Sequence, residues 1–144
     1  DREGMVMGNR IPTEAWRIIE PKVRRYPQNK AEYEERIDEI MNQKGGSDGQ
    51  PKGNSIGNPT ERLAIKIADD PWLQRVKREI DAVESVYNNM RPEHQKVIRV
   101  RFWSYRYHNM KYFDMERCTS YRERQMQRIV RDFIYAVGKK LGEI

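Results

Sequence analysis

Apolar side chains recur at every third or fourth residue along most of the chain, which is the spacing of one face of an α-helix. The clearest stretch follows Pro71, a residue type that favours the first turn of a helix. Its apolar positions are Leu73, Val76, Ile80, Val83, Tyr87 and Met90. No segment alternates between apolar and polar residues for long enough to indicate a strand. The pattern therefore predicts an all-α protein, in which this seam packs either within a small helical bundle or against a second copy.

The N-terminal part of the chain shows the same spacing and predicts two helices. In the first, residues 12–26, the apolar face holds Trp16, Ile19, Val23 and Tyr26. Pro21 stands inside this pattern and implies a kink or a break, because proline removes a helical hydrogen bond. Asn29 is a suitable N-cap for the second helix.

The helical pattern stops at KGGSDGQPKGNSIGNP, residues 44–59, which holds five glycines and two prolines and almost nothing apolar. Such a composition buries too little surface to offset the entropy of ordering, so it predicts a flexible linker. A phosphate-binding loop is not indicated, because no strand precedes the glycines and no Gly-Lys-Ser/Thr sequence ends them.

The last apolar pattern, residues 121–141, separates into two faces. Its apolar sector holds Met126, Ile129, Val130, Phe133, Ile134, Val137 and Leu141. Ser120 and Glu123 have the spacing of a capping box that would open this helix. A shorter helix at about 109–117 and a three-residue break at 118–120 are expected before it.

The face opposite the apolar sector is basic, and it lies in the only basic part of the chain. The formal net charge is +6. Residues 1–90 hold 15 Lys and Arg against 16 Asp and Glu, whereas residues 91–144 hold 13 against 6. The asymmetry indicates a polyanion-binding end. A short helix, a turn and a longer helix with outward Arg and Gln near its start form the layout of a helix-turn-helix.

Arginine can bind guanine and glutamine can bind adenine, so these residue types can read base edges in a major groove. The same side chains can bind phosphates, or form no more than a solvated helix face. The pattern favours double-stranded DNA as the partner. The candidate contacts are Tyr121, Arg122, Arg124, Gln125, Gln127, Arg128, Arg131, Lys111 and Arg106.

These patterns divide the chain into four parts. We expect an N-terminal helical segment at 9–43, a flexible Gly-rich linker at 44–58, a helical hairpin at 59–90 and a helix-turn-helix region at 91–144. No enzymatic activity, cofactor or metal is expected, since His94 and His108 lack Cys, Asp or Glu at metal-ligand spacing. No apolar run approaches the roughly 18 residues of a membrane span. The single cysteine excludes an internal disulfide and fits a reducing cytoplasm.

Residues 124–142, RQMQRIVRDFIYAVGKKLG, resemble the C-terminal end of the RinA/ArpU-type transcriptional activators of phages that infect Gram-positive bacteria. Arg124, Met126 and Arg128 fall on the Arg, apolar and Arg positions of that family's recognition helix. Further motifs in matching order extend the resemblance over most of residues 15–142: RRYPQNK (24–30), GG (45–46), NPTERLA (58–64), IDAVESVYNNM (80–90) and VIRVRFW (97–103).

The resemblance implies a C-terminal part similar to sigma-factor region 4, in a protein that activates phage late genes together with host RNA polymerase in the bacterial cytoplasm. In that role the last helix would lie in a major groove. Arg122, Arg124, Gln125 and Arg128 would then contact bases or phosphates. The DNA backbone would be contacted by Arg131, Lys111 and Arg106.

Two positions depart from the pattern of that family. Glu116 stands where the family has a small residue, and Arg122 stands where it has a helix-capping Ser. The last helix therefore begins either after Ser120 or at Arg122, and the side chains that face the groove depend on which.

Two other functions share these sequence features. A small terminase-like packaging protein also joins a DNA-binding helical bundle to an oligomerising part. A helical adaptor would use the same arginines to bind acidic protein partners. Homo-oligomerisation through the neutral N-terminal helices is compatible with each of these functions.

Overall fold

The computed structural model describes residues 10–42, 59–104 and 111–144. Helices hold 82% of these residues, and no strand occurs among them, so the prediction of an all-α protein is confirmed. The expected linker at 44–58 lies outside the described residues.

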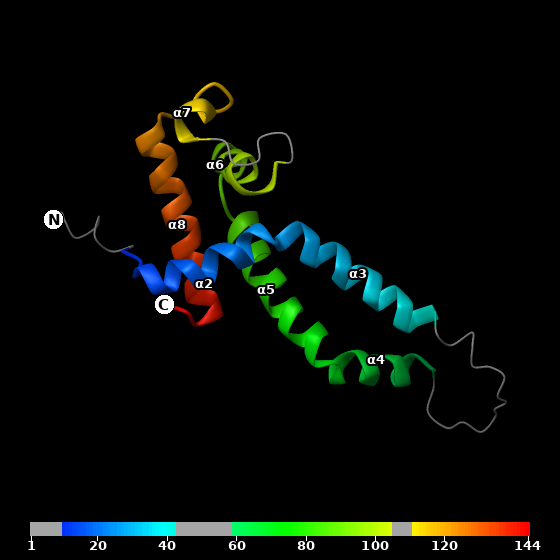
Figure 1. Cartoon of the computed structure of the whole chain (residues 1–144). Coiled ribbons are helices and arrows are strands. Elements are labelled where there is room, and N and C mark those ends of the chain that lie inside the picture. Colours follow the sequence, from blue (N-terminus) through cyan, green and yellow to red (C-terminus); the bar gives the residue numbers. More distant parts are fainter. Residues whose placement is uncertain (1–9, 43–58, 105–110) are drawn as a thin grey trace. The chain divides into compact units, whose positions relative to one another are not determined.

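The described helices are shown in Figure 1. In chain order they are α2 (Thr13–Arg24), α3 (Tyr26–Asn42), α4 (Pro59–Asp69), α5 (Pro71–Asn88), α6 (Pro92–Ile98), the π-helix η2 (Arg99–Trp103), α7 (Tyr112–Met115) and α8 (Glu123–Leu141). As predicted, Pro71 occupies the first turn of α5, where its missing N–H costs nothing.

The junction of the first two helices differs from the expectation. Pro21 does not break α2, and the break follows at Arg25, whose N–H still donates to the Pro21 carbonyl over 3.0 Å. α3 then begins at Tyr26, so the prediction that Asn29 caps it is wrong: Asn29 lies buried inside the helix. Pro27 explains the earlier start, because proline favours the first turn.

The chain divides into two compact units. The first combines the residues up to Pro27 with Asp81–Ile144, and the second is Gln28–Ile80. The first unit therefore contains α2, α6, η2, α7 and α8 together with the second half of α5. It also contains every candidate DNA contact that the structure describes.

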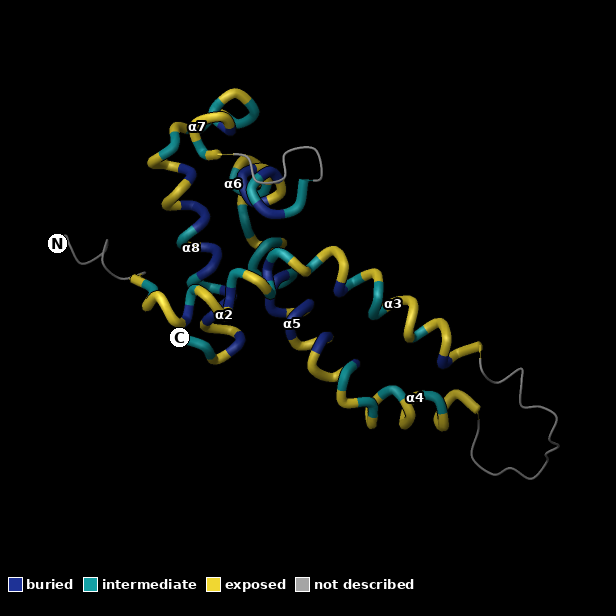
Figure 2. The backbone as a smooth tube through the Cα atoms, viewed as in Figure 1, coloured by how far each residue is buried: buried dark blue, intermediate teal, exposed yellow. Residues whose placement is uncertain are grey.

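The core of the first unit is built on the apolar face of α8. All residues of the predicted sector are buried: Met126, Ile129, Val130, Phe133, Ile134, Val137 and Leu141. Figure 2 shows this buried side of α8 alternating with an exposed side. The sector joins a cluster with buried side chains from α2, α6 and η2, namely Ala15, Ile19, Val23, Val97, Ile98, Val100 and Phe102. The apolar side of α8 thus packs into the core of the unit, whereas most of its polar side faces solvent.

Trp103 at the end of η2 ties several of these helices together. Its indole N–H donates to the Val23 carbonyl of α2 over 2.7 Å. Its ring centroid lies 5.0 Å from that of Tyr26, 5.2 Å from that of Tyr87 and 6.3 Å from that of Phe133. The tilted and edge-on arrangements are those that aromatic pairs prefer. One ring therefore fixes α2, α5 and α8 around η2.

In the second unit, Asp70 connects α4, α5 and α3. Its Oδ1 accepts from the Leu73 N–H over 3.0 Å and so caps the start of α5. Its Oδ2 accepts from the Arg36 Nη2 of α3 over 2.7 Å. The Arg36 guanidinium also lies over the Trp72 ring, 5.6 Å from its centroid. The Leu73 hydrogen bond and, after it, Arg36 lower the pKa of Asp70 below its ordinary value.

Candidate nucleic-acid interface

The last helix begins later than a cap at Ser120 would place it. α8 starts at Glu123, and Arg122, with extended backbone angles, is its N-cap. The predicted capping box of Ser120 and Glu123 is therefore wrong. The residue at the third helical position is Gln125, whose Oε1 accepts from the Arg122 N–H over 2.9 Å. Only this half of a capping box is chemically possible, because a guanidinium has no acceptor to offer the first-turn amides.

Glu116 supplies the acceptor that Arg122 lacks. Its Oε2 accepts from the Glu123 N–H, the first amide of α8, over 2.8 Å. A carboxylate at this place satisfies one unpaired donor and also interacts favourably with the positive end of the helix dipole. Glu116 thus caps the helix in place of a side-chain acceptor at position 122.

The connection between α7 and α8 is longer than the predicted three-residue break, since it covers residues 116–122. α7 itself is one turn long, and residues 109 and 110 of the expected helix lie outside the described part. Thr119 orders the connection. Its Oγ1 accepts from the Tyr121 N–H over 3.2 Å and lies 3.3 Å from the Met115 carbonyl oxygen, to which it donates.

Two side chains hold α7 against the rest of the first unit. Met115 is fully buried in the core. Tyr112 lies under the Arg101 guanidinium of η2, which is 4.1 Å from the ring centroid. Burial raises the pKa of the Tyr112 phenol, against the opposing effect of Arg101. Short as it is, α7 therefore has a fixed position relative to η2 and α8.

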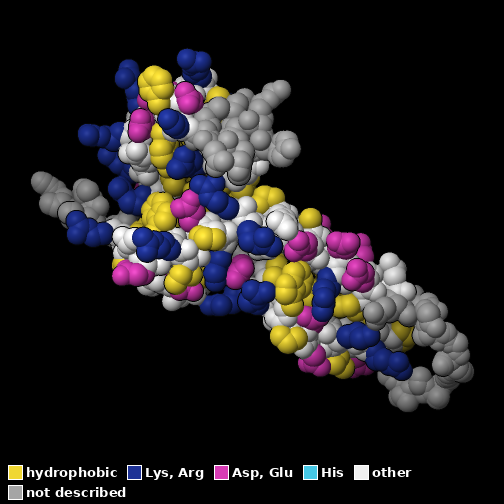
Figure 3. All heavy atoms as spheres, viewed as in Figure 1, with side chains coloured by type: hydrophobic (Ala, Val, Ile, Leu, Met, Phe, Trp, Pro, Cys, Tyr) yellow, Lys and Arg dark blue, Asp and Glu magenta, His cyan; other side chains and the backbone are white. Residues whose placement is uncertain are grey.

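The outer face of α8 carries the side chains that the sequence indicated as DNA contacts. Those that are exposed are Arg122, Arg124, Gln125, Gln127 and Arg128. In the described part of the chain, no ion pair involves any of these three arginines. Figure 3 shows Lys and Arg side chains gathered along the outer side of α7 and α8. The three arginines of this face are therefore exposed to solvent and form no ion pair within the described chain, whereas Gln125 and Gln127 are hydrogen-bonded to the start of α8.

Two of the predicted contacts are half-buried and therefore only partly accessible to a partner. Arg131 is half-buried, and its Nε is enclosed without a hydrogen-bond partner. Tyr121 is half-buried, with its ring edge-on to that of His94 at a centroid distance of 5.5 Å. Lys111 is exposed at the N-cap of α7. Arg106 lies outside the described residues.

Sequence reasoning missed two residues of this region. Glu116 was noted only as a departure from a pattern, because a cap that comes from seven positions before the helix has no local signature. Arg117, on the connection after α7, is an exposed cation that belongs with the same basic surface. The count of positive charges in residues 91–144 would have been enough to include Arg117 among the candidate contacts.

Neither a metal site nor a membrane span is found in the described ranges. No group of three His, Cys, Asp or Glu residues there is placed to hold a metal ion. None of the described helices is both long enough and apolar enough to cross a bilayer.

Comparison with known proteins identifies a family but no function. Residues 22–139 match the family model described as a protein of unknown function (DUF722). No curated protein and no solved structure matches the chain. The matched range includes α7 and all of α8 except its last two residues.

Proposed function

We propose that this chain, which belongs to the DUF722 family of proteins of unknown function, is a sequence-specific DNA-binding protein that activates phage late genes with host RNA polymerase. The observation that supports DNA binding best is the outer face of α8. It presents Arg122, Arg124 and Arg128 to solvent without ion pairs in the described chain, while the opposite face is buried. A helix with one buried apolar face and one exposed basic face is suited to binding a negatively charged partner.

In the proposed mechanism α7, the connection after it and α8 act as a sigma region-4-like helix-turn-helix. The first half of α8 enters a major groove. Arg124 and Arg128 contact base edges or phosphates, and Arg122 contacts DNA at the start of the helix. Lys111 and Arg131 contribute backbone contacts, as does Arg106 outside the described residues.

Gln125 has a narrower role than the sequence suggested. Its Oε1 accepts from the Arg122 N–H, which uses one of the two lone pairs of that oxygen and directs it towards the start of α8. Recognition of adenine by glutamine uses both the oxygen and the nitrogen. Because the contact with Arg122 competes with adenine for this oxygen, we expect Gln125 to favour donation to an acceptor, such as a phosphate oxygen or guanine.

The activator role rests on the resemblance of residues 124–142 and the upstream motifs to the RinA/ArpU-type activators. That resemblance supplies both the late-gene promoter and host RNA polymerase as expected partners. The second unit, built from parts of α3 and α5 with α4, offers a surface for polymerase or for a second copy.

A binding site selected from a random pool of DNA duplexes would test DNA binding directly. On the selected duplex, Arg128→Ala should weaken binding about tenfold, because an arginine contact to a base or phosphate contributes roughly 1–3 kcal/mol. The melting temperature should not fall, since Arg128 is exposed. The measurement is a gel shift combined with thermal unfolding.

Arg17→Ala is the matched control, because Arg17 is also an exposed arginine of the first unit but lies on α2. It should leave the affinity unchanged. Equal affinities for both variants and the unmodified protein would remove Arg128 from the interface. Failure to retain any duplex at low salt would instead favour an adaptor that binds acidic proteins. DNA binding by a ring-sized assembly without an effect on transcription would favour a packaging protein.

A further inference from the structure

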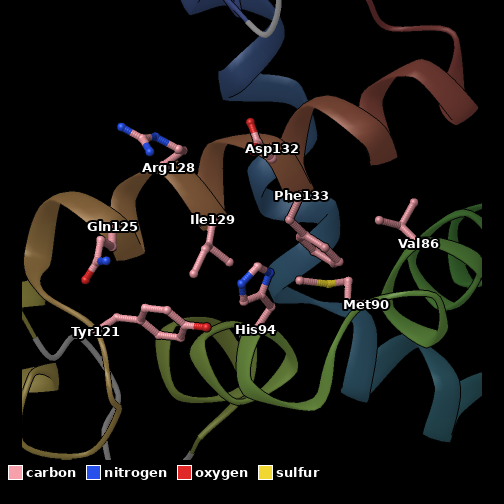
Figure 4. Close-up of a pocket in the computed structure, with 9 residues that line it drawn as sticks. All are labelled: Val86, Met90, His94, Tyr121, Gln125, Arg128, Ile129, Asp132 and Phe133. Atoms are coloured by element: carbon pink, nitrogen blue, oxygen red, sulfur yellow. The ribbon is translucent and has the colours of Figure 1, made fainter. Parts of the chain in front are cut away.

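An open pocket of about 340 Å³ lies in the first unit, next to the outer face of α8. Val86 near the end of α5 and Met90 in the turn after it line the pocket, together with Ile129 and Phe133 of α8. Figure 4 shows Ile129 and Phe133 on the side of the pocket formed by α8, and Val86 and Met90 on the side of α5. The His94 and Tyr121 rings lie between the helices. The volume is within the range of small-molecule sites.

The interior of the pocket has the chemistry of an aromatic-binding site. Three rings line it, and those of His94 and Tyr121 meet edge to face at 5.5 Å between centroids. The thioether of Met90 faces the same space. Aromatic ligands gain from edge-to-face contacts with rings and from contact with sulfur, beyond the gain from burying their area.

The rim of the pocket favours a neutral ligand. It carries one cation, Arg128, and one anion, Asp132, so its formal charges cancel. Figure 4 shows both of these side chains directed away from His94 and Tyr121. No fixed charge therefore faces the interior, where an ionic ligand would lose its hydration without a counter-charge. The polar groups at hand are the Tyr121 hydroxyl, the His94 ring nitrogens and the Gln125 amide.

We propose that this pocket binds a free, neutral, mono- or bicyclic aromatic molecule with one hydrogen-bonding group. The apolar residues of α5 and α8 would cover its faces, and Tyr121, His94 or Gln125 would meet the polar group. The ligand would lie beside Gln125 and Arg128, which also belong to the proposed DNA-binding surface. Binding of the ligand to the free protein does not depend on the proposed function.

A free molecule suits the pocket better than a side chain of a protein partner. Large exposed apolar patches are typical of surfaces that bind other proteins. Among the described residues of the first unit, the large hydrophobic side chains that are clearly exposed are Ile18 and Phe113, and neither lines the pocket. The pocket is instead bordered by exposed polar side chains, namely Gln125, Arg128 and Asp132.

The test is a titration of indole into the full chain without DNA, followed by methyl NMR. We expect the resonances of Val86, Met90 and Ile129 to shift saturably, with a Kd on the order of 1 mM or tighter for so small a probe. Cyclohexanol, a neutral ring without aromatic character, should bind roughly three- to tenfold more weakly, which is the worth of aromatic contacts. Absence of saturable shifts, or equal affinities for the two probes, would overturn the proposal.

A blocking variant locates the binding. Val86→Trp places a large ring into the pocket from a half-buried position on α5 and should abolish the indole shifts. Ile67→Trp is the control, because Ile67 is also half-buried but lies on α4 in the second unit. Indole binding that survives Val86→Trp would place the ligand elsewhere. If Val86→Trp does not fold, the comparison of indole with cyclohexanol in the unmodified protein still tests the proposal.

Discussion

At Gly138 of α8, the space that a side chain would fill is already occupied. A Cβ built on this residue would clash with the Cδ1 of Ile19 from α2 and would lie 2.8 Å from the Cδ1 of Ile144. Ile19 is completely buried, so a shift of its Cδ1 would have to displace other core side chains. Glycine, which weakens a helix interior, is therefore used here for the approach of α2 to α8.

Gly138→Ala should lower the free energy of unfolding. Overpacking a filled site costs about 1–3 kcal/mol, and the better helix propensity of alanine returns about 1 kcal/mol. We expect a net loss of up to about 2 kcal/mol in denaturant unfolding. The loss should be smaller in an Ile19→Val background, which removes the clashing Cδ1 atom. An identical loss of stability in both backgrounds would mean that the contact with Ile19 is not the cause of the destabilisation by Gly138→Ala.

At the scale of single elements, the start of α5 depends on the ionised state of Asp70. Its folded-state pKa is lower than the ordinary value of 3.8. The carboxylate therefore stabilises the fold at pH values above that ordinary value, and this contribution is lost as the pH falls through the folded-state pKa. Near neutral pH it is fully present.

Asp70→Asn should thus lower the melting temperature at neutral pH and make less difference in acid. The variant keeps an oxygen that can cap the Leu73 N–H, but it loses the charge that faces Arg36. Thermal unfolding of both proteins over a series of pH values measures the gap. A gap that stays constant down to acid pH would show that the charge of Asp70 does not stabilise the fold.

Elements were predictable from the sequence where local spacing determines them. The apolar sector of α8 was predicted completely, because burial of one helix face repeats with the helical period. The start of α8 was predicted only as one of two alternatives, and Arg122 is the correct one. Local sequence could not decide between them, because the acceptor comes from Glu116 in the preceding connection. The same limit applies to Tyr121, which the sequence predicted as a DNA contact. Its ring packs against His94, a contact between elements that no local pattern encodes.

At the scale of the whole molecule, the charge distribution makes a prediction about salt. The described surface from Lys111 to Leu141 carries eight Lys and Arg against four Asp and Glu. If four of the cations contact phosphates, binding should weaken roughly a hundredfold between about 50 and 200 mM salt. The measurement is the slope of log Kd against log salt concentration for the selected duplex.

The slope of log Kd against log salt concentration also distinguishes phosphate contacts from base contacts. Loss of a phosphate contact in Arg128→Ala would make the slope shallower by about one, whereas loss of a base contact would leave it nearly unchanged. A slope near zero for the unmodified protein would exclude phosphates as the partner of the basic face. The family match and the helical fold would be unaffected by that result.

The carboxylate of Glu116 has a further consequence for any DNA complex. The N-terminus of a helix commonly receives a phosphate, because its free N–H groups and dipole attract anions. In α8 that place is already taken by an internal anion, and an approaching phosphate would be repelled by it. Recognition of DNA by this face would then depend on side chains, which can be substituted, and not on backbone N–H groups. Its specificity should accordingly be open to redesign, one arginine at a time, without rebuilding the helix that presents them.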